Sequence, residues 1–307
     1  MKSALETVSV LGAGAMGAVY ASKFYDMDKA CVSLVAEGKR YERLREKGLI
    51  VNNVHYSIPV VRPEDEAPPS DLIIVALKHH HLPLGIHDIR KRVGANSLIL
   101  SVMNGIDSEE QIGAVYGMDK VLYTVAVGID AMRQENTVTY TTQGRLLFGE
   151  AKNPTLSERV RRVQSFLDRA GIAYETPEDM VRMLWWKYMV NVGVNQASAV
   201  LGASYSVFQS SQEARGLMES AMREVISLAK AAGVHLSEQD LEDWYSVLSG
   251  LGPEGKTSML QDIEARRKTE VEMFAGRVVE LGHIYGIPTP VNETLLRIIK
   301  VAEQYGE

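Results

Sequence analysis

The chain has 307 residues, of which 46% are hydrophobic and 23% charged, and its net charge is −6. This composition is typical of a soluble globular protein with two domains, and the negative charge argues against a nucleic-acid-binding surface. No apolar run reaches the ~18 residues of a membrane span, and residues 1–6 lack the apolar segment of a secretion signal. The single cysteine, Cys31, excludes an internal disulfide. We therefore expect a cytoplasmic protein without nucleic-acid or membrane partners.

The first half alternates short apolar runs with helix-like segments. Runs rich in Val, Ile and Leu have the length of strands covered on both faces, which indicates a largely parallel sheet. They are Thr7–Leu11, Ala30–Ala36, Asp71–Leu77, Ser97–Val102 and Val121–Val127. Helices are predicted at Met16–Tyr25, Arg40–Lys47, Leu82–Val93 and Ser157–Ala170, and another one opens at the capping-box spacing that starts at Asp107. Val138–Tyr140 and Arg145–Phe148 are predicted to form a terminal β pair.

After about residue 176 the strand pattern ends and periodic helical segments follow. They are Asp179–Leu201, Gln212–Ala232, Glu238–Leu248, Ser258–Tyr285 and Asn292–Gln304. Gly and Pro residues with turn chemistry separate most of them. The sequence therefore predicts an α/β fold, in which residues 1–178 form a doubly wound parallel sheet and residues 179–307 form an all-helical domain.

A glycine-rich turn lies directly between the first predicted strand and the first predicted helix. Its sequence, Gly12-Ala13-Gly14-Ala15-Met16-Gly17, has the G-x-G-x-x-G spacing. The first glycine permits a tight turn, the second lets a pyrophosphate approach the backbone, and the third allows the helix to pack closely on the strand. Free N–H groups at the helix start then hold the phosphates. In this βαβ context the turn predicts a Rossmann-type dinucleotide-binding domain; a purely structural turn is the alternative.

The residue after the second strand of such a domain usually contacts the adenosine ribose. Here it is Glu37, whose carboxylate suits the 2′-hydroxyl of NAD. The neighbouring Lys39 and Arg40 suit the 2′-phosphate of NADP, and all three could also be solvated loop charges. The residues alone leave the choice between NAD and NADP open.

Three polar residues, each four positions from the next, interrupt an apolar segment of the second half. Lys187, Asn191 and Asn195 share one face of the predicted helix. Burying such groups without partners costs about 1–3 kcal/mol each, so this polar stripe must meet protein, water or a ligand. The alternative for Lys187 is an aliphatic stem that carries the ammonium group to the surface.

Lys78 and Asn104 follow two predicted strands at their carboxyl ends, which is the edge where ligands bind in doubly wound sheets. The run His79-His80-His81 lies beside Lys78. Consecutive residues point in different directions and no carboxylate or cysteine cluster accompanies them, so we predict no metal site.

Ser258 and Glu270 are further candidates on the predicted helix Ser258–Tyr285. The S-x-x-Q spacing favours Ser258 as the N-cap. In a straight helix the two residues are ~18 Å apart, which predicts that they do not both hold one small substrate.

Three segments follow one another in an order with a known counterpart. They are Trp186-Lys187-x-x-x-Asn191-x-x-x-Asn195, Ser258-Met259-Leu260-Gln261-Asp262 and Arg267-Lys268-Thr269-Glu270. Together with the glycine-rich turn, they give a chain that resembles the ketopantoate reductase family (2-dehydropantoate 2-reductase) over essentially its whole length. The resemblance implies a Rossmann domain joined to a helical domain, with the active site in the cleft between them.

The resemblance also implies an activity, which is NADPH-dependent reduction of ketopantoate to pantoate in pantothenate and coenzyme A biosynthesis. The lysine matching Lys187 acts as general acid, and the asparagines matching Asn191 and Asn195 bind the substrate. The other implied assignments are Asn104 for cofactor and substrate, Lys78, Ala131 and Glu270 for the cofactor, and Ser258, within Gly255–Ser258, for the substrate.

Two departures from the family pattern keep alternatives open. Glu37 stands where the family usually has a basic residue, so NAD is an alternative to NADP. Tyr205 stands where some members have a substrate-binding asparagine, so another 2-oxo acid is an alternative to ketopantoate. A β-hydroxyacid dehydrogenase and a dinucleotide-sensing protein without catalysis are the rival functions. We expect a small-molecule 2-oxo acid as partner and allow a homodimer.

Overall fold

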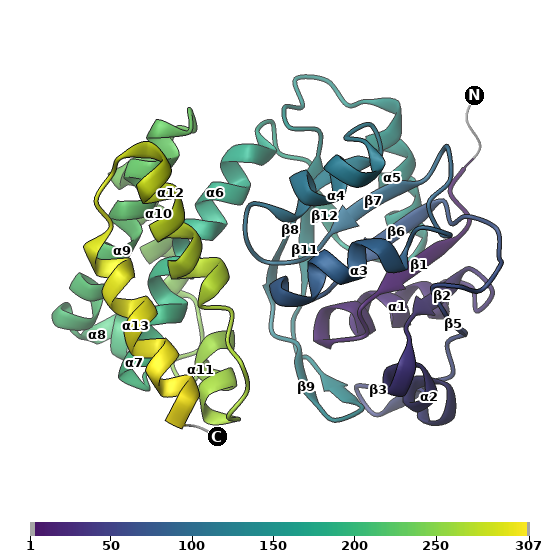
Figure 1. Cartoon of the computed structure of the whole chain (residues 1–307), viewed down its shortest axis with the longest axis horizontal. Coiled ribbons are helices and arrows are strands. Elements are labelled where there is room, and N and C mark those ends of the chain that lie inside the picture. The colour runs from purple at the N-terminus through teal and green to yellow at the C-terminus, as the bar shows by residue number, and fades with distance from the viewer. Residues whose placement is uncertain (1–3, 306–307) are drawn as a thin grey trace. The chain divides into compact units, whose positions relative to one another are not determined.

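The computed structural model describes residues 4–305 (Figure 1), so residues 1–3 of the N-terminal segment lie outside the described part. The chain folds into two compact units, which are Met1–Val181 and Arg182–Glu307. The roles predicted for the two halves, dinucleotide binding and substrate binding, stay predictions. Across residues 4–305, every helix is too short or too polar to cross a membrane.

An eight-stranded sheet forms the centre of the first unit, with the strand order β12-β11-β8-β7-β6-β1-β2-β5. Its strands are β1 Val8–Leu11, β2 Val32–Val35, β5 Val60–Val61, β6 Leu72–Val75, β7 Leu98–Ser101, β8 Val121–Ile129, β11 Gln143–Gly149 and β12 Tyr174–Glu175. Neighbouring strands in the stretch β8-β7-β6-β1-β2-β5 are parallel, and β11 pairs with β8 in the antiparallel sense. The order of those parallel strands is that of a doubly wound Rossmann sheet, which confirms the predicted fold class.

A second, smaller sheet shows that the predicted terminal β pair is wrong. Its order is β4-β3-β10-β9, and its strands are β3 Leu49–Val51, β4 Val54–Tyr56, β9 Met132–Gln134 and β10 Thr137–Thr139. β10 pairs with β9 and β3, whereas β11 pairs with β8 and β12. The physical reason is local: Glu135 has a φ of +52°, so the two residues between β9 and β10 close a tight hairpin that supplies the partner of β10.

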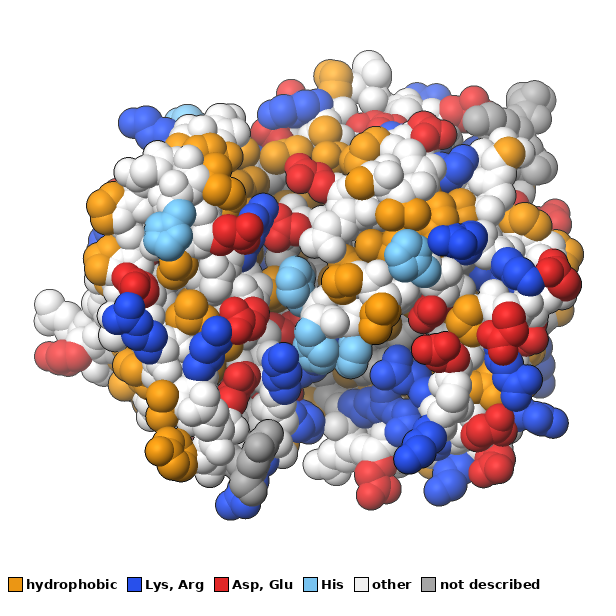
Figure 2. Space-filling model, viewed as in Figure 1, with side chains coloured by type: hydrophobic (Ala, Val, Ile, Leu, Met, Phe, Trp, Pro, Cys, Tyr) orange, Lys and Arg blue, Asp and Glu red, His pale blue; other side chains and the backbone are white. Residues whose placement is uncertain are grey.

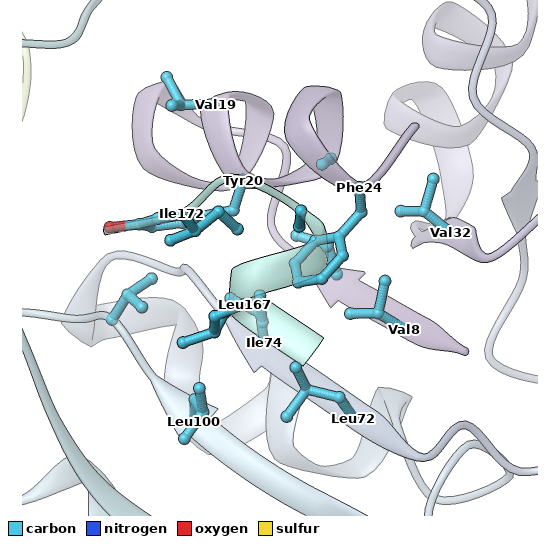
Figure 3. Packing of buried hydrophobic residues seen from close by; sticks show 14 of the residues in the cluster. Val8, Val19, Tyr20, Phe24, Val32, Leu72, Ile74, Leu100, Leu167 and Ile172 are labelled. Atoms are coloured by element: carbon cyan, nitrogen blue, oxygen red, sulfur yellow. The ribbon is translucent and has the colours of Figure 1, made fainter. Parts of the chain in front are cut away.

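Helices cover both faces of the large sheet, because apolar strand residues alternate between its two sides. They are α1 Ala15–Met27, α2 Gly38–Lys47, η1 His79–His81, α3 Leu82–Asp88, α4 Ser108–Tyr116 and α5 Glu158–Arg169. On one side, Tyr20 and Phe24 of α1 and Leu167 of α5 lie over Val8 and Leu72 (Figure 3). The opposite side holds a second cluster that includes α3 and α4: Leu11, Ile73, Val75, Leu82, Ile86, Ile99 and Ile112.

The second unit is helical, as predicted, but its helices are divided differently. They are α6 Met180–Val190, η2 Asn191–Asn195, α7 Gln196–Leu201, α8 Tyr205–Ser210, α9 Gln212–Ala231, α10 Glu238–Ser249, α11 Ser258–Glu264, η3 Glu272–Gly276, α12 Arg277–Tyr285 and α13 Pro290–Tyr305. The segments η2 and η3 are π-helical. Helix α8 was not predicted from the sequence.

The predicted continuous helix Ser258–Tyr285 is wrong, because the chain leaves the helix after Glu264. Arg266 has a φ of +51°, and the N–H of Arg267 donates to the carbonyl oxygen of Asp262 at 2.8 Å. This is the hydrogen bond of a Schellman-type helix end, in which a left-handed residue stops the helix. The next helical segment is the π-helical η3, which begins at Glu272.

Candidate functional site

The glycine-rich turn packs tightly against the end of β6. Gly12 has a φ of +98°, and a Cβ atom there would lie 2.5 Å from the carbonyl oxygen of Ala76. A Cβ atom on Gly17 would lie 1.9 Å from the carbonyl oxygen of Gly12, so helix and turn are in direct contact. At Gly14 the nearest atom is 4.0 Å away, which leaves that face open for another molecule.

The start of α1 offers backbone donors to an anion. Gly14 is the N-cap and makes no side-chain cap, and the first turn of the helix carries no acidic residue. Ala15 and Met16 are partly exposed. The first N–H groups of a helix lack partners within the helix and carry a partial positive charge. The turn therefore fits the pyrophosphate of a dinucleotide.

Lys78 and Asn104 lie beyond the ends of two adjacent strands at the same edge of the sheet as the turn. Leu11 of β1 is in register with Val75 of β6, which is in register with Ser101 of β7. Lys78 and Asn104 each follow the last residue of their strand by three positions. Both are partly exposed. Over residues 4–305, no group of three or more His, Cys, Asp or Glu side chains is placed to hold a metal ion.

Ala131 lies between β8 and β9, and the residue two positions later connects it to the turn. Arg133 donates from Nη1 to the carbonyl oxygen of Ala13 at 2.6 Å and from Nε to the carbonyl oxygen of Glu135 at 2.7 Å. The structure thus brings β9, which directly follows Ala131, to the predicted phosphate-binding segment. Arg133 was not among the predicted site residues, because its strand is too short to be recognised from the sequence.

In the second unit, the structure joins the two asparagines of the polar stripe to Ser258. Asn195 Nδ2 donates to Asn191 Oδ1 at 3.1 Å, and Ser258 Oγ donates to Asn195 Oδ1 at 3.2 Å. Asn195 is 6% exposed. Lys187 lies one turn before Asn191 on the same continuous path of α6 and η2, and it is partly exposed. Ammonium, amide and hydroxyl groups therefore lie on one face.

Ser258 is available to this face because it is not the N-cap, contrary to the prediction. The N-cap of α11 is Thr257, whose hydroxyl accepts a hydrogen bond from the N–H of Leu260 at 3.3 Å. Ser258 is the first helical residue, and its side chain projects sideways to Asn195. The cap shifts by one residue because a threonine hydroxyl can fill the same role.

The charge of Glu270 influences Lys187, at the other end of the stripe. Burial lowers the pKa of Lys187 to about 8, and the negative charge of Glu270 acts in the opposite direction. The expectation that Ser258 and Glu270 could not act at one place assumed a straight helix, and the break at Arg266 removes that assumption. Ser258 thus bonds Asn195, and the charge of Glu270 acts on Lys187.

Two buried side chains, one on α6 and one on α7, fix the segment after Glu270 to the helical path that carries Lys187. Tyr188 Oη donates to the carbonyl oxygens of Phe274 at 2.9 Å and Met273 at 3.2 Å. Gln196 Oε1 accepts from the N–H of Ala275 at 3.1 Å. Both bind backbone groups of the π turn η3. These residues were missed because a tyrosine and a glutamine in an apolar helix are ordinarily packing residues.

Tyr205 supports the segment that leads to Ser258. Its N–H donates to the carbonyl oxygen of Gly255 at 3.0 Å, and a Cβ atom on Gly255 would lie 2.8 Å from Cδ2 of the ring. Burial raises the pKa of the phenol. The ring therefore occupies the position where a larger residue at 255 would stand.

The first unit has a Rossmann sheet with a glycine-rich turn, and the helical unit that follows it in sequence has a lysine near two asparagines. This combination is typical of oxidoreductases that use a nicotinamide dinucleotide. The family model described as ketopantoate reductase PanE/ApbA matches residues 8–153, and the model of the C-terminal part of the same family matches residues 179–303. The chain therefore belongs to the ketopantoate reductase family.

Individual relatives agree with this family over nearly their whole length. A 2-dehydropantoate 2-reductase of Mesorhizobium japonicum is 25% identical, and the match covers 95% of this chain and 96% of the relative. The crystal structure of 2-dehydropantoate 2-reductase from Methylococcus capsulatus is 25% identical with a TM-score of 0.82, covering 98% of each chain. A D-mandelate dehydrogenase bound to NADH and anilino(oxo)acetate shares the fold, with a TM-score of 0.86 at 19% identity and coverage of 98% and 99%.

Proposed function

We propose that the protein is a 2-dehydropantoate 2-reductase, which reduces the C2 ketone of ketopantoate to pantoate with NADPH. The observation that carries the proposal is the stripe in the second unit, where Lys187 has a pKa near 8 and Asn191, Asn195 and Ser258 are linked by hydrogen bonds. Relatives named 2-dehydropantoate 2-reductase that align over nearly the whole chain support it.

The dinucleotide supplies the hydride that reduces the ketone carbon. We assign its pyrophosphate to the turn from Gly12 to Gly17 and its contacts at the sheet edge to Lys78, Asn104 and Ala131, because these residues lie at or beside that edge. The open face of Gly14 and the uncapped start of α1 fit that ligand.

Lys187 then serves as the general acid. Its ammonium group donates a hydrogen bond to the ketone oxygen and delivers the proton as negative charge develops there. With a pKa of about 8, the group is mostly protonated at neutral pH, yet it releases the proton more readily than an ordinary lysine. Glu270 keeps the pKa from falling further.

Neutral side chains position the substrate in this proposal. Asn191 and Asn195 offer amide groups without adding charge. They orient polar groups of the substrate by hydrogen bonds, and they do not attract its carboxylate as a second positive charge would. Ser258 binds the carboxylate or a hydroxyl group of the substrate. Asn104 fixes the carbonyl geometry toward the nicotinamide.

Tyr205 is the observation that favours a second candidate, the reduction of another 2-oxo acid. Its ring packs on Gly255, within the stretch that the family resemblance assigns to substrate binding. An aromatic ring in place of an amide would favour an apolar side chain on the 2-oxo acid over a hydroxylated one.

One set of assays separates these functions. NADPH and NADH oxidation are measured with ketopantoate and with 2-oxo acids that carry branched or aromatic side chains. The proposal expects the highest kcat/KM with NADPH and ketopantoate. Oxidation of 3-hydroxy acids without reduction of 2-oxo acids would instead identify a β-hydroxyacid dehydrogenase, and cofactor binding without any turnover would identify a sensing protein. A homodimer and a cytoplasmic location remain further proposals.

A further inference from the structure

A group of arginines lies beside the glycine-rich turn and takes no part in the stripe. Arg40 and Arg43 lie three residues apart on α2, so they share one side of that helix, and Arg133 reaches the turn from β9. Burial and then the positive charges of Arg43 and Arg40 lower the pKa of Arg133, so the three guanidinium groups influence one another electrostatically. In Figure 2, basic side chains gather over the region where α2, β3 and β9 lie in Figure 1. We call Arg40, Arg43 and Arg133 the arginine cluster.

Within residues 4–305, the arginine cluster has no carboxylate in ion-pair contact, although its charge is concentrated. Nε of Arg43 is buried without a hydrogen-bond partner. The hydrogen bonds of Arg133 among residues 4–305 go to the neutral carbonyl oxygens of Ala13 and Glu135. The positive charges of the three arginines repel one another. A buried donor without a partner, such as Nε of Arg43, costs about 1–3 kcal/mol. An anionic ligand would relieve both costs.

The acids nearest the cluster do not neutralise it. Glu37 precedes α2, is exposed and makes no side-chain cap. Asp88 is influenced by both Glu37 and Arg40: burial and the charge of Glu37 raise its pKa, and Arg40 lowers it. These two acids therefore act at the Arg40 end, and neither forms an ion pair with Arg43 or Arg133 in the described part of the chain.

The position of the cluster identifies the anion. The bond from Arg133 to Ala13 places one guanidinium at the turn, and α2 begins directly after β2, where the adenosine ribose of a dinucleotide is contacted. The pyrophosphate has its own backbone donors at the start of α1. We infer that the arginine cluster binds the 2′-phosphate of NADP(H), replacing the basic residue that is absent at Glu37. This inference rests on the proposed use of a dinucleotide, and it selects NADPH over NADH.

The charge balance supports NADPH despite Glu37. A 2′-phosphate carries nearly two negative charges, which suits a cluster of three guanidinium groups beside which Glu37 is the exposed carboxylate at the start of α2. Arginine binds phosphate through paired N–H donors, and hydrogen bonds to charged groups contribute about 1.5–3 kcal/mol each. The loss of one such arginine should therefore weaken NADPH binding roughly 10- to 150-fold, by the conversion of about 1.4 kcal/mol per tenfold change.

The test is equilibrium binding to the full-length protein without any 2-oxo acid, so it does not depend on catalysis. Titrations with NADPH and with NADH give separate Kd values for the wild type, Arg133→Met and Arg43→Met. Methionine keeps an unbranched stem and removes the guanidinium group. We expect NADPH to bind the wild type at least tenfold more tightly than NADH, and each variant to weaken NADPH alone. The matched control is Arg161→Met, an exposed arginine of α5 that should change neither Kd.

Adenosine 2′,5′-bisphosphate and adenosine 5′-monophosphate provide a second comparison that requires no variant. The wild type should bind the bisphosphate more tightly, and the advantage should shrink as salt is added. Equal weakening of NADPH and NADH in the variants would overturn the inference, because it would place the arginines on the pyrophosphate. Equal or tighter binding of NADH by the wild type would also overturn it. If neither dinucleotide binds, the proposed function fails together with the inference. Reduction of a 2-oxo acid by NADH alone would overturn the inference and the choice of NADPH, and would leave the 2-oxo acid reductase activity standing.

Discussion

Lys187 in the helical unit and Glu109 in the sheet unit are two ionisable groups that respond to burial in the same way and differ in their neighbours. Burial favours the neutral form of either group. It lowers the pKa of Lys187 to about 8, against the charge of Glu270. It raises the pKa of Glu109 to about 7, against hydrogen bonds from Ser108 and from the backbone N–H of Thr124.

The difference in neighbours separates a functional group from a structural one. Glu109 is 1% exposed; it accepts from Ser108 Oγ at 2.9 Å and from the N–H of Thr124 at 3.3 Å. Ser108 in turn bonds Ser101 at 2.7 Å, so this network connects α4 to the sheet. Lys187 is partly exposed on a face of amide and hydroxyl groups. A shifted pKa therefore indicates catalysis only where the surroundings also suit a ligand.

The largest effect should come from Lys187→Met. Removing the proton donor should lower kcat for 2-oxo acid reduction by about 10²–10⁴-fold, because the developing alkoxide then takes its proton from water. The Kd for NADPH, measured by titration, should stay near that of the wild type. A variant with kcat close to normal would remove Lys187 from the mechanism.

The pH dependence of reduction should follow Lys187, which must be protonated to act as an acid. We expect kcat to fall as the pH rises through about 8. Glu270→Gln removes a charge that raises this pKa, so the fall in kcat should move to lower pH. Glu272→Gln, on the exposed end of η3, is the matched control and should leave the profile in place. A profile that Glu270→Gln leaves unmoved, or moves upward, would contradict the assigned pair.

Tyr188 should act as a positioning residue, with a smaller effect. Tyr188→Phe removes the hydrogen bonds to the carbonyl oxygens of η3, so Glu270 should be held less closely to Lys187. We expect kcat to fall about fivefold, since one buried hydrogen bond contributes about 1 kcal/mol, and the pH profile to move in the same direction as in Glu270→Gln. Adding Tyr188→Phe to Glu270→Gln should then move the profile no further. Lower stability with an unchanged profile would mean that Tyr188 has only a structural role.

The two units also differ in how much of them could be predicted from the sequence. The central strands were recognisable because they are continuous apolar runs, such as Leu72–Val75, all of it buried. The short strands β3 and β9 were not, because three residues carry too little pattern. In the helical unit the end of α11 was missed because an arginine, Arg266, takes the left-handed conformation that usually requires glycine.

Site residues were predictable where their spacing within one element carried the signal. Asn191 and Asn195 lie four residues apart, and their side chains form the hydrogen bond that such spacing allows. The contact of Arg133 with Ala13 joins residues 120 positions apart in the chain. Only the fold creates that contact, so no local pattern could reveal it.

The smallest effect on activity should come from Glu109→Gln, which tests the other side of the comparison. A carboxyl group with a raised pKa binds its proton more strongly in the folded protein. It therefore contributes stability below the unfolded pKa, and this contribution is lost as the pH rises through about 7. Glutamine fills the same space without a charge, so the variant should lose less stability than the wild type between pH 5 and pH 8, by on the order of 2–3 kcal/mol.

Urea unfolding of the full chain at both pH values measures this difference, and kcat should stay within about twofold of the wild type because Glu109 bonds to Ser108 and Thr124 and not to the stripe. An equal loss of stability in both proteins would show that Glu109 is ionised in its network. A large fall in kcat would show that the loop bearing Asn104, which directly precedes α4, depends on the carboxyl group of Glu109. Glu109 and Lys187 would then differ less in their importance for activity than their surroundings indicate.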